Sequence, residues 1–288
     1  MSSFLQNYQR QPKLFIDLPS KGKFYNDGVL EGGQHVQIPV FGMNAMDEIL
    51  FKTPDALFSG DATAQVIHSC IPTILDPWKL VGFDIDYVLL AIRIATYGDS
   101  ITINTKCPHC TDRSESVVSL QRMIQNYENY ETDFSFSIKE LTFHLKPTTY
   151  RQMTEFGIEN YSYERTLLQI AQNKDLSDEE KNKQSKLVYQ NSSNLNLRIA
   201  VSYISNITNG VEQETDAKAI TEFVSNNDAE FYNELKNSIY ALSNRWKMPN
   251  VDIVCGNEEC SKQYSTKVEL DYSNFFGLKF LHSRNLIS

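Results

Sequence analysis

The chain of 288 residues is 41% hydrophobic and 22% charged, and its formal net charge at pH 7 is −9. This length predicts one large domain or two modest ones with a buried core, and the composition excludes a disordered polypeptide. The acidic balance argues against a protein that binds a phosphate backbone or an anionic membrane by general electrostatics.

Neither a membrane span nor a secretion signal is expected. The longest apolar stretch, around Tyr87–Ala95, is interrupted by Arg93 and is too short to cross a bilayer. The N-terminus, MSSFLQNYQRQPKLF, lacks the continuous apolar run of a signal peptide. We therefore expect the protein to be located in a cytoplasm. Thiols stay reduced there, and paired cysteines bind metal more often than they form disulfides.

Residues 1–35 are predicted to form an extended arm. The stretch LPSKGKFYNDG contains Pro19, Gly22 and Gly28, which leave little room for a helix. Apolar residues flank this stretch on both sides, so the arm must dock on another surface. Two docking partners remain open at this point, its own domain and a neighbouring subunit.

Residues 36–146 are predicted to mix helices and strands. Residues 35–40 alternate as a short strand, and residues 44–52 form a helix whose apolar face is Met46, Ile49 and Leu50. A further helix covers residues 62–70. Asp84 is expected to cap a buried helix over residues 85–96, which Gly98 ends. Residues 100–120 read as strand, knuckle and strand, and residues 134–145 read as a hairpin.

Residues 147–248 are predicted to be a largely helical block. Ser177 and Glu180 have the spacing of a capping box, and Asp228 is a good N-cap residue. The expected helices are residues 150–171, 177–207, 216–226 and 228–247.

Residues 249–288 repeat the order of strand, knuckle and strand and end in the apolar tail SNFFGLKFLHSRNLIS. The predicted fold class is therefore α+β, with zinc-ribbon-like β hairpins joined to the helical block and an extended N-terminal arm.

Four of the five cysteines form two local pairs, each predicted at the tip of a hairpin. Cys107 and Cys110 have C-x2-C spacing, and Cys255 and Cys260 have C-x4-C spacing. Both spacings suit structural Zn²⁺, because a tight turn places two thiolates within reach of one cation. We expect all four to bind one structural Zn²⁺ and so to clip together the two ends of residues 111–254.

Two alternatives stay open for these pairs. They can be unliganded or disulfide-linked, or CPHC can be a redox dithiol, which would need a helix N-terminus behind it. The segment after Cys110 reads instead as turn and strand. His109 is expected to be exposed rather than a ligand, and Cys70 to be a core thiol.

The sequence contains no motif of a catalytic site. The histidines form no HExxH and no evident pair with a carboxylate, and phosphate-binding loops and nucleophile elbows are missing. The paired acids Asp84 and Asp86 stand at a predicted helix start, where they favour the dipole. Glu258 and Glu259 are expected to be solvated. We therefore predict no enzyme activity and no small-molecule substrate.

Three segments resemble the baseplate hub proteins of T4-type contractile-tailed bacteriophages. They are LPSKGKFY (18–25), IRIATYGDSITINTKCPHC (92–110) and VCGNEECSKQYSTKVELDYSNFF (254–276). The resemblance covers about the first 120 residues and the last 40. It would lead us to expect CxxC in the second pair, so the place of Cys260 is an open question.

The resemblance implies a structural or assembly protein of the baseplate hub, with other hub proteins as partners. It would be found in the host cytoplasm during assembly, and in the tail baseplate of the virion if it is retained. One alternative is a transient assembly chaperone that the virion lacks. Another is a zinc-ribbon module that binds nucleic acid, against which the acidic balance argues.

Overall fold

The computed structural model describes residues 9–32, 37–51, 53, 58–127, 131–248 and 250–268. By contacts the chain divides into unit 1, Met1–Tyr130 with Met248–Ser288, and unit 2, Glu131–Lys247. Unit 2 is thus an insertion into unit 1. The hairpin of residues 134–145 falls with the helices in unit 2, whereas the sequence grouped it with the N-terminal region. The apolar tail from residue 269 onward lies outside the described residues.

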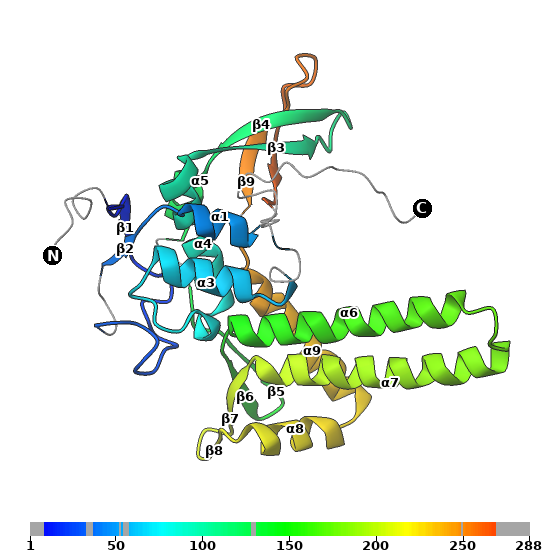
Figure 1. Ribbon diagram of the computed structural model, residues 1–288. Coiled ribbons are helices and arrows are strands. Elements are labelled where there is room, and N and C mark those ends of the chain that lie inside the picture. Colours follow the sequence, from blue (N-terminus) through cyan, green and yellow to red (C-terminus); the bar gives the residue numbers. More distant parts are fainter. Residues whose placement is uncertain are drawn as a thin grey trace. The chain divides into compact units, whose positions relative to one another are not determined.

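Unit 1 is built from short antiparallel hairpins and helices (Figure 1). Its elements before the insertion are β1 (Leu14–Ile16), β2 (Ile38–Val40), α1 (Ala45–Phe51), α3 (Asp61–Cys70), the 3-10 helix η2 (Pro77–Lys79), α4 (Gly82–Tyr97), β3 (Ser100–Lys106), β4 (Arg113–Ser119) and α5 (Leu120–Gln125). After the insertion come β9 (Val251–Val254) and β10 (Gln263–Thr266). The predicted α+β class is confirmed, and the sheets are small and antiparallel.

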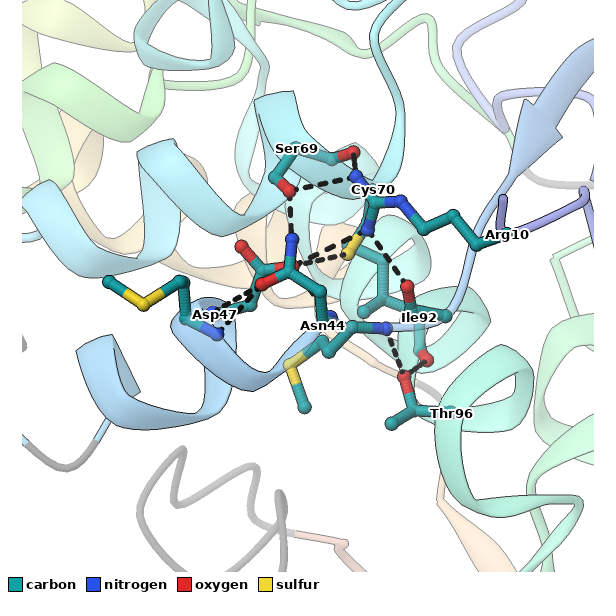
Figure 2. A network of polar contacts seen from close by, with 10 residues as sticks. Arg10, Asn44, Asp47, Ser69, Cys70, Ile92 and Thr96 are labelled. Atoms are coloured by element: carbon teal, nitrogen blue, oxygen red, sulfur yellow. Dashed lines mark hydrogen bonds and ion pairs between the residues drawn. The ribbon is translucent and has the colours of Figure 1, made fainter. Parts of the chain in front are cut away.

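The described part of the N-terminal arm docks on its own unit. β1 pairs antiparallel with β2, and Ile16 and Leu18 are buried. Arg10 reaches further, as Figure 2 shows. Its guanidinium donates to the carbonyl oxygen of Gly42 at 3.0 Å and to that of Ser69 at 2.5 Å. Of the two docking partners that the sequence left open, residues 9–32 therefore use their own domain.

α1 turns the opposite face to the core from the one predicted. Its acidic residue Asp47 is buried, and the carboxylate accepts hydrogen bonds from the Ser69 hydroxyl at 3.0 Å and from the Asn44 amide at 2.9 Å. Met46 and Ile49, which were expected to face the core, are 70% and 55% exposed. The buried face of this short helix consists of Asp47, held by its polar partners, and the apolar Phe51.

α4 is the buried helix of unit 1, as the sequence predicted, but it begins earlier. Its N-cap is Val81, so Asp84 lies inside the first turn and does not cap the helix. Residues along α4 on every side are fully buried, including Val88, Leu89 and Leu90. A helix that is apolar all round belongs in a core, and here it organises the rest of the unit.

The LPSKGKFY segment wraps around the Asp84 carboxylate. The amide of Ser20 donates to Oδ1 at 3.0 Å, and the hydroxyls of Ser20 and Tyr25 both donate to Oδ2. Burial raises the pKa of Asp84 to about 6, although these hydrogen bonds favour its charged form. The Tyr25 hydroxyl also accepts from the Val81 amide at 3.1 Å. This network, which we call the Asp84 clamp, ties the arm to the start of α4.

Unit 2 contains a sheet that the sequence did not predict in full. The four antiparallel strands lie in the order β5-β6-β7-β8. The elements are β5 (Ser135–Ile138), β6 (Leu141–Leu145), α6 (Tyr150–Gln172), α7 (Asp178–Ser202), β7 (Ile204–Thr208), β8 (Gln213–Glu214), α8 (Ala217–Asn226), α9 (Ala229–Ser243) and the 3-10 helix η3 (Asn244–Trp246). The predicted hairpin of residues 134–145 is β5 and β6.

The prediction of a continuous helix to Ile207 is wrong. α7 ends at Ser202, and the β-branched run that follows forms β7 and pairs with β6. Ile204 and Ile207 are buried by this pairing. The Gly210 turn, with φ of 89°, then leads into β8.

α6 and α7 form a long antiparallel helical hairpin (Figure 1). Both begin with a capping box, Thr149 with Gln152 and Ser177 with Glu180, and the second was predicted. α9 packs on the sheet through Phe231, whose ring centroid is 6.1 Å from that of the fully buried Phe143. Among the described residues, no helix is long and apolar enough to cross a membrane.

The Asp84 clamp gives a first prediction. Tyr25→Phe should lower the free energy of unfolding of unit 1 by about 1–3 kcal/mol, because Asp84 loses a donor and the Val81 amide loses its acceptor. Denaturant-dependent hydrogen exchange of the α4 amides measures this change. Tyr97→Phe is the matched control, since its hydroxyl bonds Glu48 on an exposed surface. Equal effects of the two substitutions would contradict a role for the clamp.

Candidate metal centre

The first cysteine pair lies in the knuckle between β3 and β4. These strands pair antiparallel from Ser100–Ser119 to Lys106–Arg113. The Cys107 amide donates to the carbonyl oxygen of Asp112 at 2.9 Å, and the Thr111 amide donates to that of Cys107 at 2.9 Å. Thr111 has φ of 65°, which reverses the chain directly after Cys110. The turn thus brings both sulfur atoms to one side of the hairpin.

The second pair lies in a knuckle of closely similar design between β9 and β10. The Cys255 amide donates to the carbonyl oxygen of Lys262 at 2.9 Å, two residues beyond the second cysteine, as in the first knuckle. Ser261, directly after Cys260, has φ of 44°. Its amide donates to Asn257 at 2.9 Å, the same four-residue step that links Thr111 to Cys107. The longer C-x4-C spacer therefore keeps the turn and adds two residues before it.

The two knuckles meet, as the sequence predicted. The sulfur of Cys107 lies 3.9 Å from that of Cys260, and the sulfur of Cys110 lies 3.5 Å from that of Cys255. All four sulfur atoms lie within 4.8 Å of one another. Cys260, whose place was open, is therefore a full member of the cluster.

Contacts outside the cysteines hold the two hairpins together. The hydroxyls of Thr105 on β3 and Tyr264 on β10 are hydrogen-bonded at 2.7 Å. The amide side chain of Asn257 donates to the Asp112 carboxylate. Each of these two contacts joins residues more than half the chain apart. The sequence has no local signal for such contacts, so the four residues were not predicted.

Gly256 allows a close approach between the two hairpins. A Cβ atom at this position would lie 3.1 Å from the Cβ and 3.4 Å from the hydroxyl oxygen of Ser114 on β4. This spacing is tighter than ordinary van der Waals contact, so an added methyl group would require Ser114 to shift. A glycine at position 256 thus serves the close packing against Ser114, and it does not serve an unusual backbone angle.

The thiols do not ionise alike. Exclusion of water opposes ionisation of Cys107, but the amides of Cys110 and His109 donate to its sulfur and lower its pKa to about 7. At Cys110 an amide hydrogen bond favours the thiolate, yet burial and the neighbouring sulfurs raise the pKa to about 12. One thiolate therefore disfavours the next, and a cation would relieve that repulsion.

The geometry fits a tetrahedral cation. Four ligands at the usual zinc–sulfur bond length of ~2.3 Å stand ~3.8 Å apart along each tetrahedral edge. Two of the six sulfur–sulfur separations, 3.9 Å and 3.5 Å, bracket that value, and all six are within 4.8 Å. Four sulfur donors are also the set typical of structural zinc.

The other residues considered from the sequence lie elsewhere. His109 is exposed and contributes only its amide, which donates to the Cys107 sulfur at 3.4 Å. Cys70 is buried in α3, where burial and the Asp47 carboxylate raise its pKa to about 12. Among the other histidines, the His68 ring bonds the Ile74 carbonyl oxygen, while His35 and His282 lie outside the described residues.

The close contact at Gly256 gives a second prediction. Gly256→Ala should destabilise unit 1 by about 1 kcal/mol through overpacking, measured by denaturant-dependent hydrogen exchange in β3 and β4. In a Ser114→Gly background, which removes the opposing atoms, the same substitution should cost nothing. Gly157→Ala on α6, where the new methyl meets nothing within 4 Å, should stabilise unit 2. A cost at Gly256 that persists without Ser114 would refute the contact.

The comparisons with known proteins agree with the three segments singled out in the sequence. The family model described as T4 bacteriophage base plate protein matches residues 18–277. That span covers the Asp84 clamp, both knuckles and the whole of unit 2. Among curated proteins and among solved structures, no match to the chain is found. Because the family model spans most of its length, the chain belongs to the T4 bacteriophage base plate protein family.

Proposed function

We propose that this chain is a structural or assembly protein of the baseplate hub, and that Cys107, Cys110, Cys255 and Cys260 hold one Zn²⁺. The observation that carries the proposal is the cluster of four sulfur atoms from both ends of unit 1, in a chain of a baseplate family. Membership of the family supports other baseplate proteins as partners. Their assignment to the hub rests on the resemblance of the three segments.

Zinc would act here as a structural clip. The knuckles flank the inserted unit 2, so the cation would join residues that stand 145 and 153 positions apart. Closing a loop of that length costs conformational entropy, and metal–thiolate bonds offset this cost. The zinc would hold the β9–β10 hairpin against β4 independently of the conformation of unit 2.

A catalytic role for the metal is not part of this proposal. Four thiolates fill the tetrahedron, so no position remains for water or substrate. Baseplate proteins of this family are generally structural rather than enzymatic. Asp84, the most buried acid of those considered, is engaged by Ser20 and Tyr25 and has a structural use.

In this proposal the chain works in the host cytoplasm while the hub assembles, and a structural component is then retained in the tail baseplate. The exposed apolar residues of α1, Met46 and Ile49, support a protein that buries further surface in an assembly. A transient chaperone would use the same surfaces and leave before the virion is complete.

Metal analysis is the direct test of the zinc assignment. The purified chain should contain one zinc per molecule, and Cys255→Ser and Cys260→Ser should each lose most of it, because three thiolates and a hydroxyl bind zinc poorly. Cys70→Ala is the matched control and should keep its zinc, since that thiol lies in α3 away from the cluster. Full zinc content in Cys260→Ser would remove that residue from the ligand set.

Proteomics of purified virions tests whether the chain is a component of the baseplate hub. A hub component should be found at a constant ratio to the other baseplate proteins, and deletion of its gene should stop tail assembly. Loss of tails together with absence of the chain from virions would identify the transient assembly chaperone. Normal tails in the deletion would contradict both roles.

A further inference from the structure

α6 has apolar residues on two opposite faces, and its own unit covers one of them. The covered face packs along α7. It includes the buried Ile170 and also Phe156, whose ring centroid lies 5.8 Å from the guanidinium carbon of Arg198 on α7. Glu159 on the same face accepts hydrogen bonds from Arg198 at 3.0 Å. These contacts establish which side of α6 faces its neighbour.

The opposite face carries what we call the α6 stripe, Ile158, Tyr161, Arg165 and Leu168. At 3.6 residues per turn, these positions point roughly 180° away from the residues that contact α7. The three apolar members of the stripe are 36%, 51% and 55% exposed in chain order. Their positions follow the alternating spacing of three and four residues by which one helix packs on another. A solvated helix face is polar, so this pattern points to a partner helix.

The α6 stripe is complementary to itself. A second copy of α6 can lie antiparallel to the first, with a two-fold axis at the level of Tyr163, so that residues equally far on either side of this level face each other. Ile158 then faces Leu168 of the second copy, and Tyr161 faces its Arg165. The two-fold axis makes each of these contacts twice. An apolar pair and a guanidinium on an aromatic ring are both favourable contacts.

The charges of α6 favour a second copy over a charged partner. The exposed charged residues of the helix are two of each sign, Arg151, Glu155, Glu164 and Arg165, while Glu159 is paired on the other face. The exposed side of α6 is therefore neutral overall, although the chain has a net charge of −9. Two copies can meet there with less of the repulsion that acts between acidic chains. A neutral face also has no net charge with which to select an acidic or a basic partner.

We propose that α6 is the interface of a homodimer, in which two copies of the chain pack antiparallel through the α6 stripe. The contact joins one helix of each copy, and Ile158 and Leu168 stand about 15 Å apart along that helix. Such a contact is smaller than the ~800 Å² per partner of a standard interface. We therefore expect a reversible dimer with a dissociation constant on the order of micromolar. The proposal concerns unit 2 and does not depend on zinc or on a role in the hub.

Analytical ultracentrifugation of the full-length protein between about 1 and 200 µM covers this range of affinity and should show a monomer–dimer equilibrium. Leu168→Glu should weaken dimerisation about 10-fold or more, because each new carboxylate would be buried against an apolar Ile158. Leu187→Glu is the matched control, since Leu187 is 59% exposed on α7, outside the stripe. It should change the dissociation constant by less than about twofold. Circular dichroism should show both variants folded, because both side chains are exposed in the single chain.

A charge pair tests the antiparallel register. Ile158→Lys alone should weaken dimerisation about 10-fold or more, as Leu168→Glu does. The two substitutions together should bring the dissociation constant back to within about fivefold of the original, because each lysine then faces a glutamate of the other copy. In a parallel pair like charges would face each other, and the double variant would stay monomeric. The proposal is overturned if the chain is monomeric at every concentration, if Leu168→Glu acts no differently from Leu187→Glu, or if the double variant does not regain dimerisation.

Discussion

The requirement that four sulfur atoms lie within 4.8 Å of one another governs the organisation of unit 1. Each pair is positioned by a turn that reverses the chain directly after its second cysteine, at Thr111 and at Ser261. The hairpins then approach so closely that Gly256 can carry no side chain without displacing Ser114. The hydrogen bonds of the two turns and the contacts of Thr105 with Tyr264 and of Asn257 with Asp112 hold the four sulfur atoms in this arrangement.

Buried carboxylates and their hydrogen-bond donors are a second constraint, and they hold the N-terminal half of unit 1 together. Asp47 and Asp84 are both buried, and each is surrounded by donors from segments distant in the sequence. A buried carboxylate without partners would be costly, so each fixes a particular arrangement of arm and helix. The arm segment LPSKGKFY and the start of α4 are therefore one structural feature, although more than fifty residues separate them.

These constraints also show what the sequence could and could not predict. Local turn chemistry and cysteine spacing predicted both knuckles, and periodicity predicted α4, α6 and the β5–β6 hairpin. The orientation of α1 could not be predicted, because it depends on Ser69 and Arg10, which lie far from it in the sequence. β7 and β8 were missed for a different reason. The Asn209–Gly210 pair after β-branched residues is a strong hairpin signal, and the helical pattern upstream obscured it.

The insertion separates two tasks within one chain. Because the two knuckles meet within unit 1, the cysteine cluster does not constrain the length and shape of the chain between them. Unit 2 can therefore have a surface selected for something other than its own stability. Because a cluster of four sulfur atoms joins the two ends of the insertion, the chain can vary between those ends without separating the hairpins of unit 1.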